Sequence, residues 1–506
     1  MSMPALNRSI LQVGSAGIIV DVQCHFSNGL PGIVIVGLGN KAVDEARERV
    51  RSAFASSGLT MPRKRITINL APADTPKDST SLDICIATAI LRADGQIPHH
   101  EPPNTAYIGE LGLDGDIRAV RGIIGKLAAG KQHGITTFFV PKANAEQALL
   151  VPGVTIYAYE TLQELISALR NPQSQVACQV ERPLPATELT SATMFNQIMG
   201  QTRAKRALII AAAGGHNILL NGPPGTGKSM LAKALPALLP PMSREEMLSV
   251  THLYSLTSPH FEQLITERPF RTPHHTTSHV AIVGGGQRLK PGEVSLSHHG
   301  VLFLDELPEF NRQTVEALRQ PLEDGFVTVT RARDSVTYPA DFMLVATANP
   351  CPCGYFGTSQ ECSCPAYRIE QYRHRLSGPI FDRIDLHIDV EETKHTQLLG
   401  TTIDFETKTV RHAIQAARQK QQERFGADRL NAAMDNTLIR EKAALHTSAV
   451  QLLNQAAERL HISARGYMRL IKVARTIADL DLKNEITAAH MSEALQYRSL
   501  PRAPLR

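Results

Sequence analysis

The chain contains 506 residues, of which 42% are hydrophobic and 20% are charged, and its formal net charge is +5. This length suggests about three domains with packed cores, and no window offers about 18 uninterrupted apolar residues for a membrane span, so we expect no membrane partner. Residues 1–20 lack the basic, apolar and small-residue regions of an export signal, which predicts a cytoplasmic protein with reduced cysteines.

Four blocks follow one another along the chain. Residues 1–170 alternate β-rich runs with helical runs and indicate an α+β domain. Residues 171–193 collect Pro, Ser, Thr and Gln without a period, which is typical of a linker. Residues 194–390 open with a helix, an apolar strand and a glycine-rich turn, and predict an α/β unit. Residues 391–506 turn helical and predict a helical C-terminal domain.

The strongest motif follows the apolar strand HNILLNG. The stretch Gly222-Pro223-Pro224-Gly225-Thr226-Gly227-Lys228-Ser229 fits the phosphate-binding pattern GxxxxGK[ST], and the helical run MLAKALPALL comes next. In such a loop, backbone N–H groups close around phosphates, the lysine faces the β and γ phosphates, and the Ser hydroxyl is a ligand of Mg²⁺. The motif therefore predicts ATP and Mg²⁺ as cofactors.

Polar residues end the next two buried strands. Asp305 and Glu306 follow VLFL, so we expect Asp305 in the Mg²⁺ shell and Glu306 as the general base that polarises the attacking water. Asn349 ends FMLVATAN, where its amide is placed to orient that water. Taken by itself, Asn349 also fits a turn former without a catalytic part.

These motifs together resemble the AAA+ ATPases and, within them, the magnesium-chelatase-like family that includes the ComM/YifB proteins. The resemblance covers nearly the whole chain. Its most specific pieces are FSNGLPGIVIVGL, INLAPADTPK, PHHTTSHVAIVGGG, GEVSLSHHGVLFLDELPEF, ATANPCPCG, LSGPIFDRIDLHI and SARGYMRLIKVARTIADL. The implied fold class is α/β: an AAA+ P-loop ATPase core with a C-terminal helical lid, preceded by a Lon-protease-like α+β domain of the ribosomal S5 domain 2 type.

The resemblance also assigns two arginines. Arg383 corresponds to an arginine finger that reaches the ATP of a neighbouring subunit, which implies a ring, usually a homo-hexamer; the alternative is a local ion pair with Asp382 or Asp385. Arg465 corresponds to the second-sensor arginine, and the alternative is a surface arginine near a helix start.

The N-terminal block lacks an intact Ser-Lys dyad. Ser81 falls on the nucleophile of the Lon motif, but Ile124 stands where the activating lysine belongs, and Lys126 lies two residues farther on. An unassisted Ser hydroxyl is a weak nucleophile, so we expect a scaffold or a platform for DNA or partners in place of a protease.

Four cysteines lie close together in the segment after Asn349. Cys351, Cys353, Cys362 and Cys364 form a Cys-x-Cys-x8-Cys-x-Cys pattern, in which each pair is able to present two thiolates to one Zn²⁺, with His374 or water as a substitute ligand. The pattern is tighter than the usual Cys-x2-Cys knuckle. A solvated turn with reduced thiols is the alternative.

Two basic loops are candidates for DNA contact. Residues 326–338 read as a β-hairpin with Arg331 and Arg333 near its tip, and Arg288 and Lys290 lie in the glycine-rich helix-2 insert. Related ATPases point such a hairpin into the channel of the ring, where the arginines would face a phosphate backbone. The alternative pairs Arg331 and Arg333 with Asp324 or Asp334.

Resemblance to ComM implies an ATPase that drives a ring motor on single-stranded and branched DNA, namely a branch-migration helicase that promotes integration of incoming DNA during natural transformation, with recombination proteins as partners. A protein-remodelling AAA+ ATPase and a magnesium-chelatase-type motor subunit are the alternatives; the fused block of residues 1–170 argues against the second. ATPase activity stimulated by DNA separates these classes.

Overall fold

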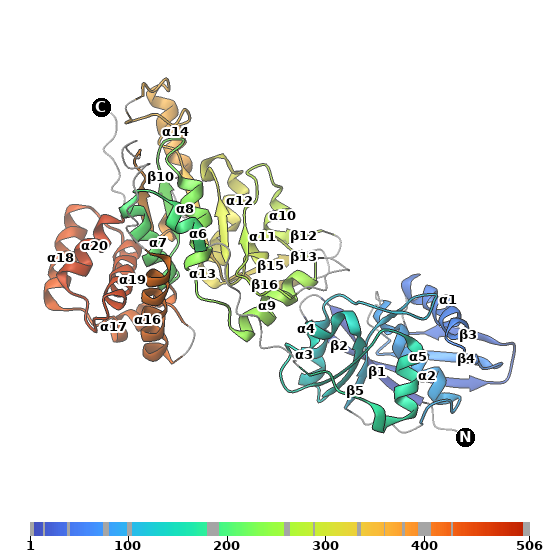
Figure 1. Cartoon of the computed structure of the whole chain (residues 1–506). Coiled ribbons are helices and arrows are strands. Elements are labelled where there is room, and N and C mark those ends of the chain that lie inside the picture. The colour runs from blue at the N-terminus through green and yellow to red at the C-terminus, as the bar shows by residue number, and fades with distance from the viewer. Residues whose placement is uncertain are drawn as a thin grey trace.

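The computed structural model describes residues 5–13, 16–37, 41–73, 80–98, 104–179, 192–257, 264–286, 289–330, 335–358, 360–376, 380–392, 406–426 and 429–498. Figure 1 shows an N-terminal α+β body, a central body around a sheet, and a helical C-terminal body beside the central one. Among the described residues, no helix combines the length and the apolar character needed to cross a bilayer.

The N-terminal body is built on a four-stranded sheet in the order β1-β2-β4-β3. Its strands are β1 (Ala5–Val13), β2 (Ala16–Ser27), β3 (Gly32–Val36) and β4 (Arg65–Ala71). Neighbouring residues of a strand face opposite sides of the sheet. Leu11 accordingly packs with α1 (Lys41–Ser56) and α2 (Asp83–Ala93), whereas Ile10 packs with α3 (Ile123–Gln132). Helices therefore cover both faces of β1 and β2.

A second, parallel sheet completes this body. Its strands are β5 (Thr105–Tyr107), β8 (Thr137–Pro141) and β9 (Thr155–Tyr159), and α5 (Leu162–Arg170) follows. The helix begins after Thr161, whose hydroxyl accepts a hydrogen bond from the Glu164 N–H at 3.2 Å. The first part of the segment expected as a linker stays on this body, because Cys178 N–H donates to the Ile156 carbonyl at 2.8 Å.

The central body contains a five-stranded sheet in the order β11-β14-β17-β10-β18, with parallel neighbours throughout. The strands are β10 (Ile218–Asn221), β11 (Phe270–Arg271), β14 (Val301–Leu304), β17 (Met343–Ala348) and β18 (Leu386–Asp389). β14 and β17 are buried along their whole length, as expected for parallel strands covered on both faces. The carboxyl ends of the strands share one edge, where the sequence motifs begin.

Helices flank the central sheet. α7 (Thr202–Gly214) precedes β10. The described helices after it are α8 (Lys228–Ala234), α9 (Arg244–Ser255), α10 (His279–Val283), α11 (Glu293–Leu296), α12 (Arg312–Ala317), α13 (Arg319–Asp324) and α14 (Ala366–Leu376). Arg244 of α9 donates to the carbonyls of Leu149 and Leu150, which links the central body to the N-terminal one.

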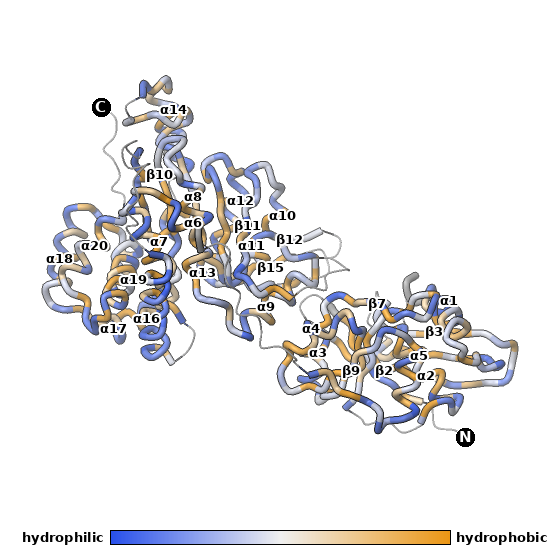
Figure 2. Tube along the Cα trace, in the orientation of Figure 1, coloured by the Kyte–Doolittle hydropathy of each residue, from blue (hydrophilic) through white to orange (hydrophobic). Residues whose placement is uncertain are grey.

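The C-terminal body is helical, with α16 (Thr407–Phe425), α17 (Asn436–Lys442), α18 (Thr447–Arg459), α19 (Ala464–Leu480) and α20 (Ala488–Gln496). α16 and α19 share one hydrophobic core with α7 and β10, and Figure 2 shows hydrophobic residues where α7 and α19 meet. His216, just before β10, joins the two bodies because its ring contacts Asp385 at 3.1 Å and Thr476 of α19 at 2.8 Å.

Candidate nucleotide site and its surroundings

The glycine-rich loop connects β10 to α8. Gly225 and Gly227 adopt positive φ angles of 80° and 86°, which favour glycine. A Cβ on Gly222 would lie 2.4 Å from the carbonyl oxygen of Val390, so the loop passes too close to the end of β18 for any side chain. The backbone conformation of this loop therefore requires glycine at these three positions.

Lys228 lies folded over this loop. Its ammonium donates to the carbonyls of Gly222 at 2.6 Å and Pro223 at 2.8 Å, and to Asn349 Oδ1 at 3.2 Å. Burial lowers the pKa of Lys228, while the nearby carboxylates of Asp305 and Glu306 raise it in part. The structure thus brings Asn349 next to Lys228 although 121 residues separate them in the chain.

Asp305 stands opposite the start of α8. The Ser229 hydroxyl donates to the two Asp305 oxygens at 3.4 and 3.2 Å, and the Thr347 hydroxyl donates to Asp305 Oδ1 at 2.6 Å. Thr347 also accepts a hydrogen bond from the Glu306 N–H at 2.8 Å, and Glu306 adopts a left-handed φ of 56°. Thr347 thereby fixes both acidic residues, and a left-handed non-glycine residue of this kind is often found at functional sites.

Sequence reasoning missed Thr347. The signal was a polar residue inside the apolar run FMLVATAN, and the structure buries it completely. The donor set around it consists of a hydroxyl and a carboxylate, which are the hard oxygen ligands that Mg²⁺ prefers. These residues fit a nucleotide bound with Mg²⁺, for which Ser229 and Asp305 would hold the ion and Lys228 would face the phosphates.

The two arginines assigned by resemblance lie together, on Glu323 of α13. Arg383 donates a hydrogen bond to Glu323, and Arg465 Nη2 lies 3.7 Å from the same carboxylate. These arginines lower the pKa of Glu323, with the hydrogen bond from Arg383 as the largest cause. Asp385, expected as an alternative partner of Arg383, contacts His216 and Arg469 at 3.1 and 3.2 Å.

Arg383 lies at the edge of the sheet remote from the glycine-rich loop of its own chain. It precedes β18, whose residues from Leu386 to Asp389 pair in parallel with Ile218 to Asn221 of β10. The loop follows the far end of β10, and four residues at about 3.3 Å each separate the two edges by roughly 13 Å. Arg465 shares this remote edge, because it contacts the same Glu323.

The four clustered cysteines converge. Their sulfur atoms all lie within 4.8 Å of one another, and Cys351 is 3.3 Å from Cys353 and 3.7 Å from Cys362. A hydrogen bond from the Tyr355 backbone, with support from the neighbouring thiols, lowers the pKa of Cys353 to about 6. The pKa of Cys362 is raised to about 12: the Cys364 backbone lowers it, but burial and the other thiols outweigh that effect.

The cysteine segment rests on the glycine-rich loop. Gly354 has a φ of 87°, and a Cβ there would lie 2.5 Å from Cδ of Pro224. A hollow of 270 Å³ lies between the two segments, lined in part by Pro223, Pro350 and Phe356. The segment that carries the four thiols therefore touches the loop and begins directly after Asn349.

The expected hairpin consists of β15 (Phe326–Thr330) and β16 (Ser335–Pro339), which pair antiparallel from Phe326 with Pro339 to Thr330 with Ser335. Its tip, with Arg331 and Arg333, lies outside the described residues, as does Arg288. In the insert, β12 (Gly284–Gly285) pairs with β13 (Lys290–Pro291), and exposed Lys290 donates to the Thr257 carbonyl at 2.8 Å.

The insert packs on the hairpin. Tyr338 donates a hydrogen bond from its hydroxyl to the Leu289 carbonyl, and a Cβ on Gly285 would lie 3.7 Å from Cγ1 of Val329. Gly285 adjoins the end of one loop and Val329 the end of the other. The described strands that flank the two candidate basic segments therefore pack side by side.

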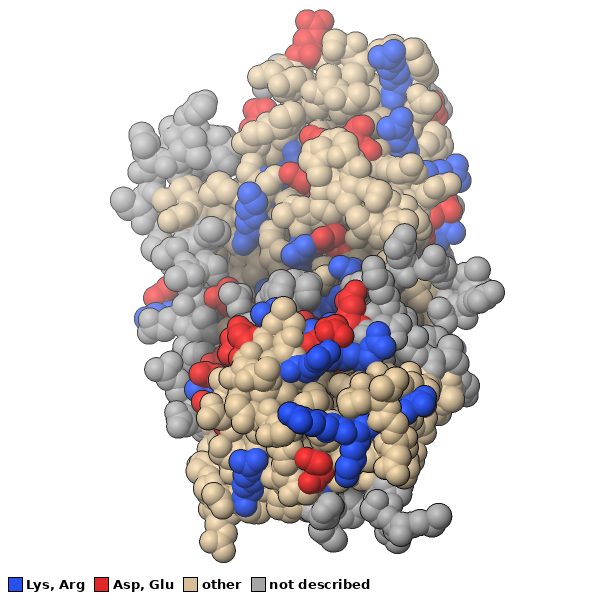
Figure 3. Space-filling model, turned by 90° about the vertical axis from the view of Figure 1, so that its right-hand side faces the viewer, with Lys and Arg blue, Asp and Glu red and all other residues tan. Residues whose placement is uncertain are grey.

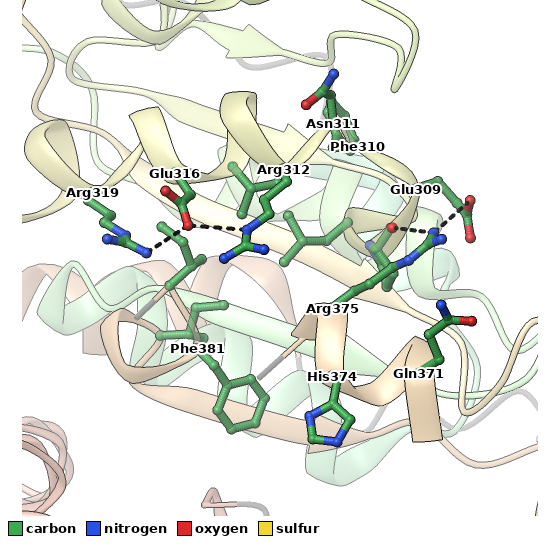
Figure 4. Close-up of a pocket in the computed structure, with 15 residues that line it drawn as sticks. Glu309, Phe310, Asn311, Arg312, Glu316, Arg319, Gln371, His374, Arg375 and Phe381 are labelled. Carbon is green, nitrogen blue, oxygen red and sulfur yellow. Dashed lines mark hydrogen bonds and ion pairs between the residues drawn. The ribbon is translucent and has the colours of Figure 1, made fainter. Parts of the chain in front are cut away.

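A groove of 770 Å³ begins directly after Glu306 and leads to the segment of Arg383 (Figure 4). Arg375 of α14 crosses it, with a hydrogen bond of 3.4 Å to the Pro308 carbonyl and a distance of 3.9 Å to Glu309. His374, named as a substitute ligand for zinc, lines this groove. Apolar side chains that include Phe310, Ile380 and Phe381 also line it.

In the N-terminal body, the residues at the two positions of the Lon dyad are buried. Ser81 is 1% exposed and Ile124 is 1% exposed. Lys126 is 2% exposed, and burial, with a smaller effect of Arg121, lowers its pKa to about 7. Ile124 offers no group that accepts a proton from Ser81.

Known families match three stretches of the chain. The family described as magnesium chelatase, subunit ChlI, matches residues 194–398; that described as subunit ChlI of Mg-chelatase matches residues 22–144; and the subunit ChlI C-terminal family matches residues 405–498. YifB of Escherichia coli (strain K12) is 41% identical over 499 residues, which cover 98% of this chain and 96% of that protein. The competence protein ComM of Haemophilus influenzae is 40% identical over 510 residues, 98% of each chain.

The chain belongs to the ComM/YifB family. This family is of the magnesium-chelatase-like AAA+ type, with mixed α/β content and a parallel sheet. The 38 kDa magnesium-chelatase subunit of Cereibacter sphaeroides is 24% identical over 339 residues, which are 93% of that subunit but 62% of this chain. We expected residues 1–170 to argue against a magnesium-chelatase-type subunit. That argument is weaker than expected, because a family described as subunit ChlI of Mg-chelatase matches residues 22–144.

Proposed function

We propose that the protein is an ATPase that forms a ring and moves DNA, as a branch-migration motor that promotes integration of incoming DNA during natural transformation. The convergence of Lys228, Ser229, Asp305 and Asn349 at one edge of the sheet supports the ATPase activity. When bound, ATP supplies the phosphate that is cleaved, and Mg²⁺ neutralises part of its charge. Glu306 is the proposed general base for the attacking water, and Asn349 orients that water.

The position of the arginines supports the proposed ring. Arg383 and Arg465 lie about 13 Å, one strand length, from the edge that carries the glycine-rich loop. Guanidinium groups at this edge serve a phosphate only if a neighbouring subunit presents its loop to them. We therefore assign both arginines to the nucleotide of the next subunit, in a homo-hexamer whose subunits also cover the groove between Glu306 and Arg383.

The observation that carries the DNA assignment is the side-by-side packing of the hairpin and the insert. Arg331, Arg333, Arg288 and Lys290 belong to these loops or to their ends, and their charges suit a phosphate backbone without sequence preference. The name of the Haemophilus relative, competence protein ComM, supports the assignment to natural transformation. Recombination proteins are the partners that we propose for this role.

The test replaces Arg331 and Arg333 by alanine together. We expect loss of DNA-stimulated hydrolysis and of branch migration on synthetic forked junctions, with basal ATPase activity and assembly unchanged. The matched control replaces Arg440 and Lys442, two exposed cations of α17, and should behave as wild type. Branch migration at the wild-type rate by the Arg331/Arg333 variant would remove the hairpin from the mechanism.

We further propose that Cys351, Cys353, Cys362 and Cys364 hold one Zn²⁺. Thiolates at about 2.3 Å from a tetrahedral zinc lie about 3.8 Å from each other. The distances of 3.3, 3.5 and 3.7 Å among Cys351, Cys353 and Cys362 are close to that value. The ion would be structural: it would fix the cysteine segment, which begins after Asn349 and packs against the glycine-rich loop.

A further inference from the structure

The outer half of the N-terminal sheet has an open face. Side chains of β3 and β4 alternate, so that Ile66 and Ile68 point into the core while Val34 and Val36 stay 37% and 43% exposed. In the described part of the chain, the helices α1 and α2 cover the other side of these strands. Register places His25, Thr67 and Val34 in one row across the open face.

A run of cations borders this face. Arg63, Lys64 and Arg65 are all exposed, and no ion pair involving them occurs among the described residues. Arg65 begins β4 on the open face, opposite Ser27 of β2. Figure 3, which views the molecule from the side of the N-terminal body, shows Lys and Arg side chains gathered on its lower half.

Apolar and aromatic side chains are interleaved with these cations. The Lys64 ammonium lies 5.4 Å from the centroid of the Phe26 ring, and Leu30, in the turn between β2 and β3, is 90% exposed. Arg65 leans over this turn, since a Cβ on Gly29 would lie 3.7 Å from its Cδ. Phe26 is opposite Ile66 and packs toward the side covered by α1 and α2, so Lys64 lies at the edge of the sheet. Arg65 and the turn that carries Leu30 border the open face directly.

We propose that this surface, formed by Arg63, Lys64, Arg65, Leu30, Val34 and Val36, binds a single strand of DNA. Exposed cations on one border complement a phosphate backbone. Exposed apolar side chains beside them offer contacts to bases, which a single strand exposes and a duplex keeps stacked inside. The inference rests on the proposed DNA substrate and adds a second contact on a different body of the chain, away from the hairpin.

The test uses the full-length protein and labelled oligothymidylate, with binding followed by fluorescence anisotropy at several salt concentrations. The variant replaces Arg63, Lys64 and Arg65 by glutamine. For single strands, each phosphate contact contributes about −0.7 to the slope of log affinity against log salt concentration. Loss of three contacts therefore makes the slope shallower by about 2. Between about 50 and 200 mM salt, wild type should then lose roughly 20-fold more affinity than the variant.

The matched control removes three exposed cations elsewhere, Lys408, Arg440 and Lys442, and should keep the wild-type slope. A second variant, Val34→Glu, places a carboxylate on the open face and should weaken strand binding severalfold while duplex binding changes little. Equal losses on strand and duplex would overturn the assignment to a single strand.

Failure of this inference is distinguishable from failure of the proposed function. If wild type binds neither strand nor forked DNA, the proposed function fails. If wild type binds DNA and the glutamine variant binds it with the same affinity and salt slope, only the N-terminal contact is refuted. We expect the variant to need more DNA for half-maximal ATPase stimulation but to reach the wild-type maximum, because the hairpin remains intact.

Discussion

Thr347→Val tests whether the buried hydroxyl of β17 sets the geometry of the two acidic residues. Valine keeps the shape and the β-branch of threonine but removes the hydroxyl, which donates to Asp305 at 2.6 Å and accepts from the Glu306 N–H at 2.8 Å. A hydrogen bond to a charged group contributes about 1.5 to 3 kcal/mol, and the Glu306 N–H is also left without this partner. The left-handed conformation of Glu306 then loses its support.

The expected result is a fall in kcat of about 10- to 100-fold, because each 1.4 kcal/mol corresponds to about a factor of ten in rate. Nucleotide affinity should change little, since Lys228 and the loop are untouched. Phosphate release measures kcat, and binding of a fluorescent ATP analogue measures affinity. Thr347→Ser, which keeps the hydroxyl, is the matched control and should retain most of the activity. Wild-type turnover by Thr347→Val would refute the positioning role.

Four further predictions address the other parts of the site. Lys228→Ala should lose nucleotide binding, whereas Glu306→Gln should bind ATP and hydrolyse it poorly; equal phosphate release by Glu306→Gln and wild type would exclude Glu306 as the base. Arg383→Ala should be inactive alone, but mixing it with Lys228→Ala subunits should restore part of the hydrolysis, because mixed interfaces combine an intact loop with an intact arginine. Absence of recovery in rings shown to be mixed would contradict action across the interface. Zinc analysis of the untagged protein should give about one ion per chain, and Cys353→Ser should lose the ion and lower the melting temperature; a zinc-free wild type would leave the cysteines as a plain loop. Burial lowers the pKa of His387 from 6.5 to about 4, so the folded state takes up its proton at lower pH than the unfolded state does. The linked stability is present above pH 6.5 and is lost as the pH falls toward 4, by about 2 kcal/mol between pH 7 and 5. Melting curves against pH should show a smaller acid loss for His387→Gln, and identical curves would contradict this origin.

The sequence predicts those parts of the site that are contiguous in the chain. The glycine-rich stretch 222–229 carries its own signal, because its pattern is contiguous and Gly225 and Gly227 meet a local demand for positive φ angles. Asp305 and Asn349 are also accessible from the sequence, since each ends an apolar run and the carboxyl ends of parallel strands share one edge. The roles assigned to them remain predictions.

Roles that depend on tertiary contacts are not predictable from the sequence. Thr347 looks like one more polar residue in a strand until the register of β14 and β17 places it beside Asp305. Glu323 looks like an ordinary helical carboxylate, and nothing local indicates that Arg383, 60 residues away, and Arg465 both reach it. The open face of the N-terminal sheet depends equally on tertiary structure, because the strand order β1-β2-β4-β3 and its register place Val34 opposite Thr67, two residues along β4 from Arg65.

Glu323 also links the proposed interface to the proposed DNA contact. It lies in the last turn of α13, which ends at Asp324, and β15 of the hairpin begins at Phe326. The carboxylate that Arg383 and Arg465 share is therefore three residues from the strand leading to Arg331 and Arg333. On the proposed function, hydrolysis on the neighbouring subunit removes the phosphate that draws these arginines away from Glu323. The strength of their pairing with α13 then changes with each turnover, next to the base of the hairpin. On this proposal, the short connection between Glu323 and β15 would let the nucleotide state of one subunit bias the hairpin of the next, whereas the loop and hairpin of a single subunit lie at the ends of separate strands.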